Sequence, residues 1–268
     1  MTEADLYTLY KGVYVPNAIH TPESLKYYEE FTFRPDDVVI VTYPKSGERP
    51  AVIRVMNRGG GYFNSQTGWT RPFFLHLLYV SAHCCRMFST LTVVPSLQVV
   101  YVMRNPKDVF TSAFHYYNIT SFLVKPGPQS EFLQKFLTGK VIFGSWFDHV
   151  KGWLNAKEEL QIMYISYEDM IKDLNDSVSR IAQFLGKPLE PDVLKKIADK
   201  CLFKNMKNNP MSNYSVVPQE FMDQTKSQFL RKGVAGDWRN LLTPEEAQHF
   251  DAVFKEKMKD VNFKFNWD

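Results

Sequence analysis

The chain has 268 residues, of which 44% are hydrophobic and 15% aromatic, so it can bury one sizeable core and requires no second domain. Its formal net charge of +3 is too small to indicate a nucleic-acid-binding protein, because local basic clusters facing a small anion explain it equally well. The most apolar stretch, residues 72–85, is too short to form a membrane-spanning helix.

Strand-like and helical segments alternate along the chain. Short apolar runs rich in β-branched residues predict buried strands at 38–42, 98–103 and 160–165. N-capping residues and apolar periodicity predict a helix that starts after residue 106, and further helices at 21–31, 145–156, 176–185, 191–200 and 243–258. This alternation indicates one α/β domain over residues 1–268, with three layers: a mostly parallel central sheet with helices on both faces. Residues 204–230 have few periodic apolar positions and predict a long loop.

A tight turn, Tyr43-Pro44-Lys45-Ser46-Gly47, follows the first predicted strand. In a strand–loop–helix phosphate-binding turn, backbone N–H groups converge, and the helix dipole and a Lys add positive charge. The turn is P-loop-like in this respect only, because no Gly precedes Lys45 at the distance that the phosphate loop of NTPases requires. Alone, the five residues are equally consistent with an ordinary turn that carries a surface Lys.

Two further basic segments have similar chemistry. Arg104 follows the second strand, at the sheet edge where parallel sheets bind ligands, and its planar guanidinium matches a phosphate bidentately. Ser112 lies a little under two helical turns beyond Pro106, and this spacing leaves open whether it reaches the same anion. Arg231-Lys232-Gly233 places two cations beside a glycine, which suits close approach to a phosphate. Each segment alone is also typical of a solvated basic loop.

Together, the three segments resemble the cytosolic sulfotransferases, in which such motifs occur in the same order. The matching residues are Tyr43-Pro44-Lys45-Ser46-Gly47, Arg104-Asn105-Pro106-Lys107-Asp108-Val109 and Arg231-Lys232-Gly233-Val234-Ala235-Gly236-Asp237-Trp238, with Tyr167-Glu168-Asp169-Met170 and Met206-Lys207-Asn208-Asn209-Pro210 in support. The resemblance covers about residues 5–47 and 97–260. It implies in-line transfer of a sulfuryl group from 3′-phosphoadenosine 5′-phosphosulfate (PAPS), with no metal.

The resemblance also implies roles for individual residues. Lys45 would be catalytic and stabilise the charge on the leaving oxygen, and a His would accept the acceptor's proton. The cofactor-binding residues would be Lys45, Ser46 and Gly47 at the 5′-phosphosulfate, Arg104, Ser112, Arg231, Lys232 and Gly233 at the 3′-phosphate, and Tyr167, Phe203 and Met206 at or near the adenine. Cys201 stands where the family usually has Thr.

The chain departs from the family directly after Gly47. Glu48, Arg49 and Pro50 stand in place of small hydroxyl residues and a Trp, which removes hydroxyl donors, a backbone N–H and an aromatic partner for the adenine. Lys45 and Arg104 are 59 residues apart. This spacing is roughly two dozen residues shorter than the family's. Residues 48–96 therefore indicate a divergent, frameshifted or mis-spliced segment.

The catalytic base is expected inside that segment. In the family it lies in an Arg-x-x-x-Thr-His-Leu sequence, which Arg71 to Leu77 resemble with Leu75 in place of Thr. We therefore expect His76 to be the base. His83 is nearer the usual distance from Arg104 and stays an alternative, as does a chain with no functional base. Either His is also consistent with a core or surface position.

The function implied is transfer of a sulfuryl group to a hydroxyl (or amine) of a small, phenolic or steroid-like acceptor. The aromatic residues within 110–117 and 146–153 favour such an acceptor. The departures after Gly47 favour an alternative, a catalytically impaired, nucleotide-binding pseudoenzyme of the same fold. A phosphate-loop kinase is disfavoured because the Gly-rich half of its loop is missing.

The sequence also predicts the compartment and the partners. Three cysteines, two of them adjacent, do not form a disulfide framework, and the acidic N-terminus lacks the regions of a signal peptide. We therefore expect a cytoplasmic protein that binds a small-molecule acceptor, with neither nucleic acid nor membrane as a partner. The family's C-terminal dimer motif is degraded, with Pro244 in place of Val and Gln248 in place of Glu, which leaves the homodimer open.

Overall fold

The computed structural model describes residues 2–30, 33, 37–46, 97–158 and 160–267. Its centre is a parallel sheet in the order β3 (Val38–Thr42), β4 (Gln98–Met103) and β5 (Gln161–Ser166). Val99 pairs with Val39 on one side and with Ile162 on the other. The predicted strands are confirmed, the third with a shift of one residue. Because the strands run in parallel, the residues that follow all three meet at one edge of the sheet.

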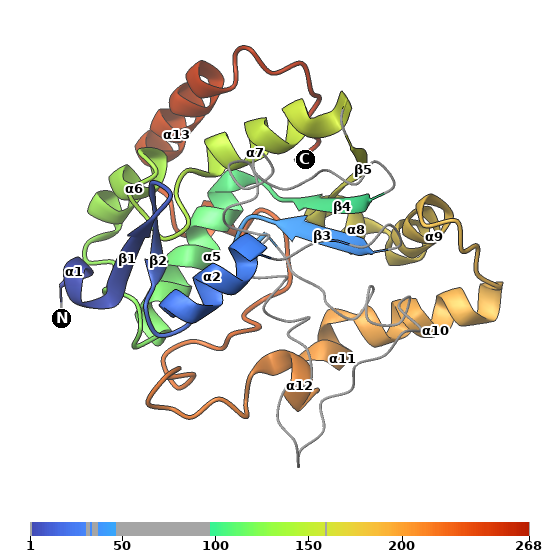
Figure 1. The fold of residues 1–268 in the computed structure, drawn as a ribbon, viewed down its shortest axis with the longest axis horizontal. Helices are drawn as coiled ribbons and strands as arrows, with labels where there is room; N and C mark the ends of the chain where they lie inside the picture. The colour runs from blue at the N-terminus through green and yellow to red at the C-terminus, as the bar shows by residue number, and fades with distance from the viewer. Residues whose placement is uncertain (1, 31–32, 34–36, 47–96, 159, 268) are drawn as a thin grey trace.

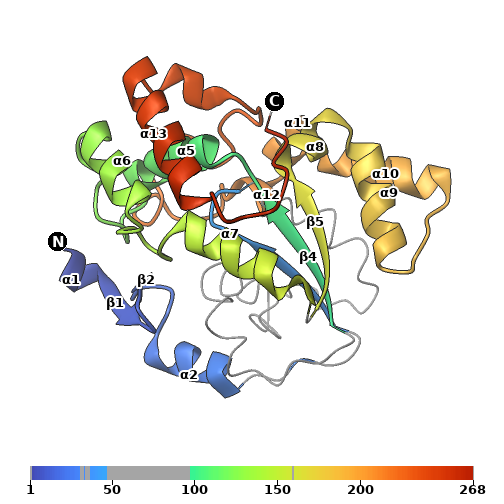
Figure 2. The same cartoon turned by 90° about the horizontal axis from the view of Figure 1, so that it is seen from above.

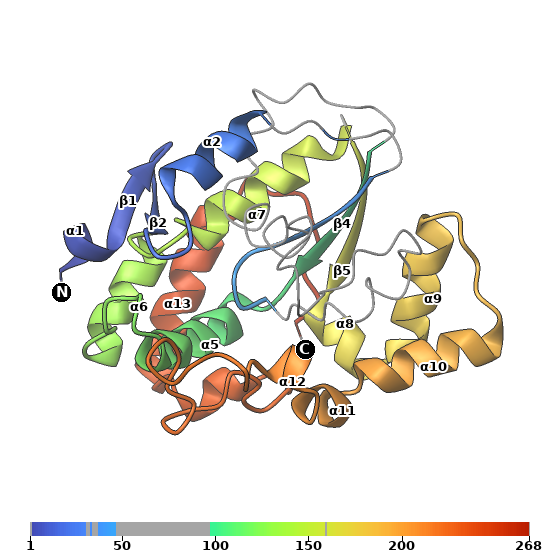
Figure 3. The same ribbon diagram turned by 60° about the horizontal axis from the view of Figure 1, so that its bottom comes forward.

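Alternate residues of the strands belong to two separate cores, one on each face of the sheet. Val41 and Tyr101 belong to the core that includes side chains of α5 (Pro106–Ile119), α6 (Gln129–Leu137), α7 (Trp146–Asn155) and α13 (Pro244–Lys257). Ile40 and Val100 belong to the core formed with α8 (Tyr167–Lys172), α9 (Leu174–Phe184) and α10 (Pro191–Cys201). Figures 2 and 3 show α7 and α9 on opposite sides of the strands. The predicted three-layer α/β fold is confirmed.

The N-terminal elements lie on the same side of the molecule as α6 (Figure 1), and Lys135 of α6 forms an ion pair with Glu3 in the first of them. They are α1 (Glu3–Leu6), the antiparallel hairpin of β1 (Tyr7–Tyr10) and β2 (Val13–Pro16), and α2 (Pro22–Glu30). Tyr14 of β2 also forms a β-bridge with Ile142, in the segment between α6 and α7. The sequence predicted α2 but not the hairpin, whose short strands are half exposed.

The predicted helices are confirmed, with ends shifted by at most one or two residues. Local signals explain their starts: the Lys107 N–H donates to Asn105 Oδ1 over 3.0 Å at α5, and Thr243 and Glu246 form a capping box at α13. The loop predicted at 204–230 is wrong in part, because α11 (Phe203–Lys207) and α12 (Pro210–Asn213) lie at its start. The sequence also missed α6, α8 and two short 3₁₀ helices, Ala156–Glu158 and Asp237–Asn240.

Some predictions fall outside the described residues. These are Gly47, the departures Glu48, Arg49 and Pro50, and the candidate bases His76 and His83. The single domain over 1–268 also stays a prediction. Within the described ranges, no helix is both long enough and apolar enough to cross a membrane.

Candidate active site

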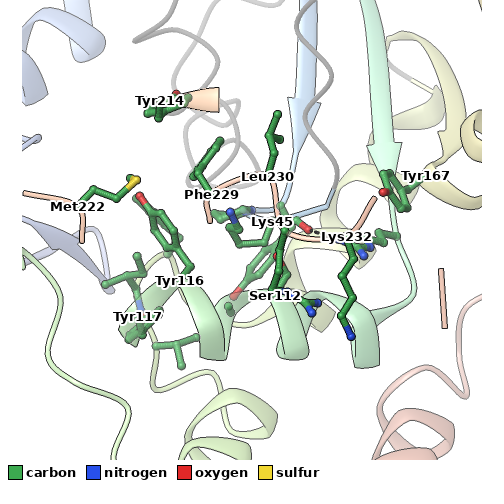
Figure 4. A pocket seen from close by; sticks show the side chains of 18 of the residues that line it. Lys45, Ser112, Tyr116, Tyr117, Tyr167, Tyr214, Met222, Phe229, Leu230 and Lys232 are labelled. Atoms are coloured by element: carbon green, nitrogen blue, oxygen red, sulfur yellow. Dashed lines mark hydrogen bonds between the residues drawn. The ribbon is translucent and has the colours of Figure 1, made fainter. Parts of the chain in front are cut away.

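A cavity of about 560 Å³ lies at the edge of the sheet where the parallel strands end. Residues from the turns after β3 and β4, from α5 and from 229–234 line it, and Figure 4 shows many of the lining side chains. The predicted cofactor residues that line this one cavity are Lys45, Arg104, Ser112, Tyr167, Phe203, Met206, Arg231, Lys232 and Gly233. The spacing left open whether Ser112 reaches the same anion as Arg104, and in the structure both residues line this cavity.

Lys45 occupies a strained turn between the two ends of the cavity. Its φ of 70° lies in the left-handed region, which costs a non-glycine residue about 1–2 kcal/mol. The Ser46 N–H donates to the Tyr43 carbonyl over 3.0 Å and closes the turn. Lys45 Nζ lies 4.4 Å from the ring centroid of Tyr116 and 4.3 Å from that of Phe229, so two rings hold the ammonium by cation–π attraction.

Arg104 joins three separate segments. Its Nη1 donates to the Lys45 carbonyl over 3.1 Å and its Nη2 to the Val234 carbonyl over 3.3 Å. The guanidinium carbon lies 4.3 Å from the ring centroid of Tyr167. Two buried donors, Arg104 Nε and Ser46 Oγ in the turn after Lys45, have no hydrogen-bond partner in the described part of the chain. Such donors suit the oxygens of a bound phosphate, so the residues fit the implied cofactor.

The third basic segment is held by a buried carboxylate, Asp237. Arg231 Nη2 and Lys232 Nζ lie 2.5 and 2.6 Å from its two oxygens, and Asn240 Nδ2 donates to it over 2.8 Å. Burial acts to raise the pKa of Asp237, but hydrogen bonds from Lys232, Asn240 and Arg231 hold that pKa well below its usual range. Asp237 therefore stays ionised and fixes both cations at the wall of the cavity.

A second aspartate anchors the same loop to α5. Asp108 Oδ2 accepts a 2.6 Å hydrogen bond from the Gly236 N–H, and its Oδ1 accepts a 2.9 Å bond from the Trp238 N–H. The side chain of Asp108 is almost fully buried. The loop that carries Arg231 is thus tied to the helix that follows Arg104.

Gly233 allows a ring to approach the backbone. Its φ is +71°, and a Cβ at this position would lie 2.2 Å from Cδ2 of Phe203. Phe203, Met206 and Tyr167 all line this end of the cavity, where the resemblance implies the adenine. Only glycine meets both requirements, the positive φ and the close ring.

The other end of the cavity is apolar. In Figure 4, Tyr116, Tyr117 and Met222 lie on one side of Lys45, and Lys232 and Tyr167 on the other. The apolar end is lined among others by Ala113, Phe132, Phe136, Val141 and Ile142. The hydroxyls of Tyr43 and Tyr117 bond to the protein itself: Tyr43 Oη donates to the Gly144 carbonyl over 2.8 Å, and Tyr117 Oη accepts from the Ile142 N–H over 2.9 Å.

Sequence reasoning missed several residues of the site. His20, to which no motif pointed, lines the apolar end, and burial lowers its pKa to about 4. Tyr116 and Phe229 carry the Lys45 ammonium, although neither matched a motif. Asp108 and Asp237 lie within two of the motifs quoted above, although no role was assigned to either. Their place inside those motifs was the only sequence feature that could have pointed to them.

Comparisons with known proteins bear on the identity of this site. A family model described as the sulfotransferase domain matches residues 77–262. Sulfotransferase 2B1 of Mus musculus is 37% identical over 98% of this chain and 83% of its own length. Sulfotransferase 2A1 of Macaca fascicularis is 35% identical over 99% of this chain and 100% of its own. The chain belongs to the sulfotransferase family.

Solved structures agree with this assignment. A mouse sulfotransferase, SULT7A1 in complex with PAP, is 31% identical and superposes with a TM-score of 0.75 over 96% of both chains. A retinol dehydratase in complex with retinol and PAP, 22% identical, shares the fold with a TM-score of 0.73 over 96% of this chain and 90% of its own. As a sulfotransferase, the chain is a transferase, and its sulfuryl donor is PAPS, as the resemblance implied.

Proposed function

We propose that this sulfotransferase transfers the sulfuryl group to a hydroxyl (or amine) of a small, phenolic or steroid-like acceptor in the cytoplasm. One observation carries the proposal: a single cavity has a cationic end at Arg104 and Lys232 and an apolar, aromatic end at Tyr117 and Phe136, with Lys45 between them. An apolar acceptor gains from burial at that end, whereas a sugar would lose hydrogen bonds with water.

The cationic end suits the donor. Arg104 and Ser112, with Arg231 and Lys232, would hold the 3′-phosphate, and Arg104 Nε supplies a buried donor for it. Lys45 and Ser46 would hold the 5′-phosphosulfate, for which Ser46 Oγ is the corresponding buried donor. The adenine would lie against three further lining residues, Tyr167, Phe203 and Met206. When bound, the donor supplies an activated sulfuryl group.

The chain's own residues then have distinct tasks. The Lys45 ammonium, held by Tyr116 and Phe229, neutralises the negative charge that develops as the bond between sulfur and the phosphate oxygen breaks. The acceptor oxygen forms the new bond to sulfur, and its proton goes to a base. His76, or alternatively His83, is the proposed base.

A panel of acceptors tests this proposal. The purified chain with labelled PAPS should sulfate phenols and hydroxysteroids at least about tenfold faster than monosaccharides, because only the former bury apolar area. Ala113→Phe narrows the apolar end and should reduce kcat/KM for steroids more than for simple phenols, while the affinity for nucleotide stays unchanged. Equal use of sugars and steroids would refute the proposed acceptor class.

Two further points concern the alternative function, a pseudoenzyme, and the assembly of the chain into a homodimer. Nucleotide binding without turnover across the panel would favour the pseudoenzyme, which the comparisons do not support. A dimer through the family motif stays a prediction. In this chain Thr243 caps α13 and Pro244 is the first residue of that helix, so the segment already starts a helix within its own chain.

A further inference from the structure

Glu168 is a buried carboxyl for which the proposed transfer has no use. It is the second residue of α8, directly after Tyr167, and only 9% of it is exposed. Its Oε1 accepts a 3.0 Å hydrogen bond from the Asn105 N–H. Asn105 is the N-cap of α5 and follows Arg104 directly. The carboxyl therefore ties the start of α8 to the turn that carries the guanidinium.

Two charged groups from other elements act on this carboxyl within the described ranges. Arg104, directly after β4, attracts the ionised form, and Asp108 in the first turn of α5 repels it. Burial raises the pKa of Glu168 to about 7, although the hydrogen bond from Asn105 and the charge of Arg104 act to lower it. The second oxygen, Oε2, is buried and has no hydrogen-bond partner among the described residues.

We propose that Glu168 is a positioning residue of the nucleotide site: it holds the turn that carries Arg104 and takes up a proton when a 3′-phosphate binds at that arginine. The inference rests on the proposed donor site. A phosphate at Arg104 brings negative charge towards the carboxylate and competes for the guanidinium's positive charge. Both effects favour the neutral carboxyl in the complex. The contribution of Glu168 to nucleotide affinity is therefore larger below pH 7 and falls as the pH rises.

Two substitutions distinguish the two roles proposed for Glu168, support of the turn at Asn105 and uptake of a proton. Glu168→Gln keeps an oxygen that accepts from the Asn105 N–H but cannot titrate, whereas Glu168→Ala leaves that N–H without its partner. Glu131→Gln is the control, because Glu131 is an exposed carboxyl on α6 that does not line the cavity. Thermal melts of all variants establish that each chain is folded.

Calorimetry with 3′-phosphoadenosine 5′-phosphate at pH 7, in two buffers of different ionisation enthalpy, counts the protons bound with the nucleotide. Because about half of the Glu168 carboxyls are ionised at pH 7, removing this group should shift the count by up to about half a proton towards release. Glu131→Gln should leave the count unchanged. Glu168→Ala should weaken binding about tenfold, since a buried donor loses its acceptor.

Each outcome decides the inference. An unchanged proton count in Glu168→Gln, with wild-type binding intact, would overturn the inference and leave the proposed function standing. Wild-type affinity in a folded Glu168→Ala chain would overturn the positioning role. If Glu168→Ala does not fold, the proton count of Glu168→Gln still decides. No binding by the wild-type chain would overturn the proposed donor site and this inference with it.

Discussion

The guanidinium of Arg104 donates a 3.1 Å hydrogen bond to the backbone carbonyl of Lys45. This bond connects the turns after β3 and β4. Arg104, which we propose binds the 3′-phosphate, therefore also holds the turn of the proposed catalytic Lys45 in its left-handed conformation. Binding of the sulfuryl donor at Arg104 and the position of the Lys45 ammonium are therefore mechanically connected. Substitution of Arg104 should therefore affect both nucleotide binding and turnover.

Arg104→Lys should impair binding and turnover together. A lysine cannot make the hydrogen bonds to Lys45 and Val234 and still present a planar fork to a phosphate, so the Kd for 3′-phosphoadenosine 5′-phosphate should rise about tenfold or more. The rate constant kcat should also fall, because the Lys45 turn loses a support. Arg180→Lys on α9, a half-exposed arginine, is the matched control. A variant with normal kcat at saturating donor would argue against the mechanical connection.

Lys45→Met should remove turnover far more than binding. The loss of one preorganised charge at the leaving oxygen is expected to reduce kcat by about 10²–10³-fold. The nucleotide retains its contacts at Arg104 and Lys232, so its Kd should change much less. Lys26→Met on α2, whose ammonium pairs with Glu30 at an exposed site, should leave both quantities unchanged. Steady-state kinetics and calorimetry measure the two effects separately.

Gly233→Ala should disturb the nucleotide site through sterics. The new methyl group would collide with the Phe203 ring, and alanine also disfavours the positive φ. The free energy of unfolding should fall by about 2–4 kcal/mol, and nucleotide affinity should drop. Gly186→Ala separates the two causes, because Gly186 has a φ of +65° and nothing within 4 Å of its added Cβ. Equal losses in both variants would show that the ring contact is unimportant.

Asp237→Asn should destabilise the chain in a pH-dependent way. The pKa of the folded Asp237 lies below that of the unfolded chain, so its stabilisation is present above about pH 4 and is lost as the pH falls further. At pH 7 the variant should lose about 1–3 kcal/mol, because Arg231 and Lys232 lose their buried counter-charge. The difference between the urea midpoints of wild type and variant should be constant above about pH 5 and should shrink steadily as the pH falls below about 4.

An exposed carboxylate serves as the control for that titration. Asp260 pairs with Lys151 at 2.6 Å but is largely exposed, so Asp260→Asn should change the midpoint far less. A wild-type curve that stays parallel to the Asp237→Asn curve down to pH 3 would contradict the assigned ion pairs.

The sequence predicted the framework of the site well. β3 and β4 are largely buried runs rich in β-branched residues, which is a strong local signal, and parallel pairing then brings Lys45 and Arg104 to one edge. The α6 helix was missed because no side chain caps its first turn. The α8 helix was missed because its N-cap, Ser166, is also the last residue of β5.

Side-chain partners across the chain could not be predicted from the sequence. Tyr116 and Phe229 reach Lys45 from a helix and from a loop, so no local pattern connects the three residues. His20 enters the cavity only because the N-terminal segment packs near Ile142 and Phe143. The base expected at His76 or His83 lies outside the described residues and stays a prediction.

The central claim is that one cavity joins a PAPS-binding end to an apolar acceptor end at Lys45. Transfer of labelled sulfuryl groups from PAPS to a phenol and to a hydroxysteroid, with the wild-type and Lys45→Met chains in one assay, tests it most directly. The account predicts sulfated product that accumulates with time in the wild type and at least about 100-fold more slowly in the variant. Wild-type protein that binds the nucleotide but forms no product, or equal rates in the two chains, would contradict it.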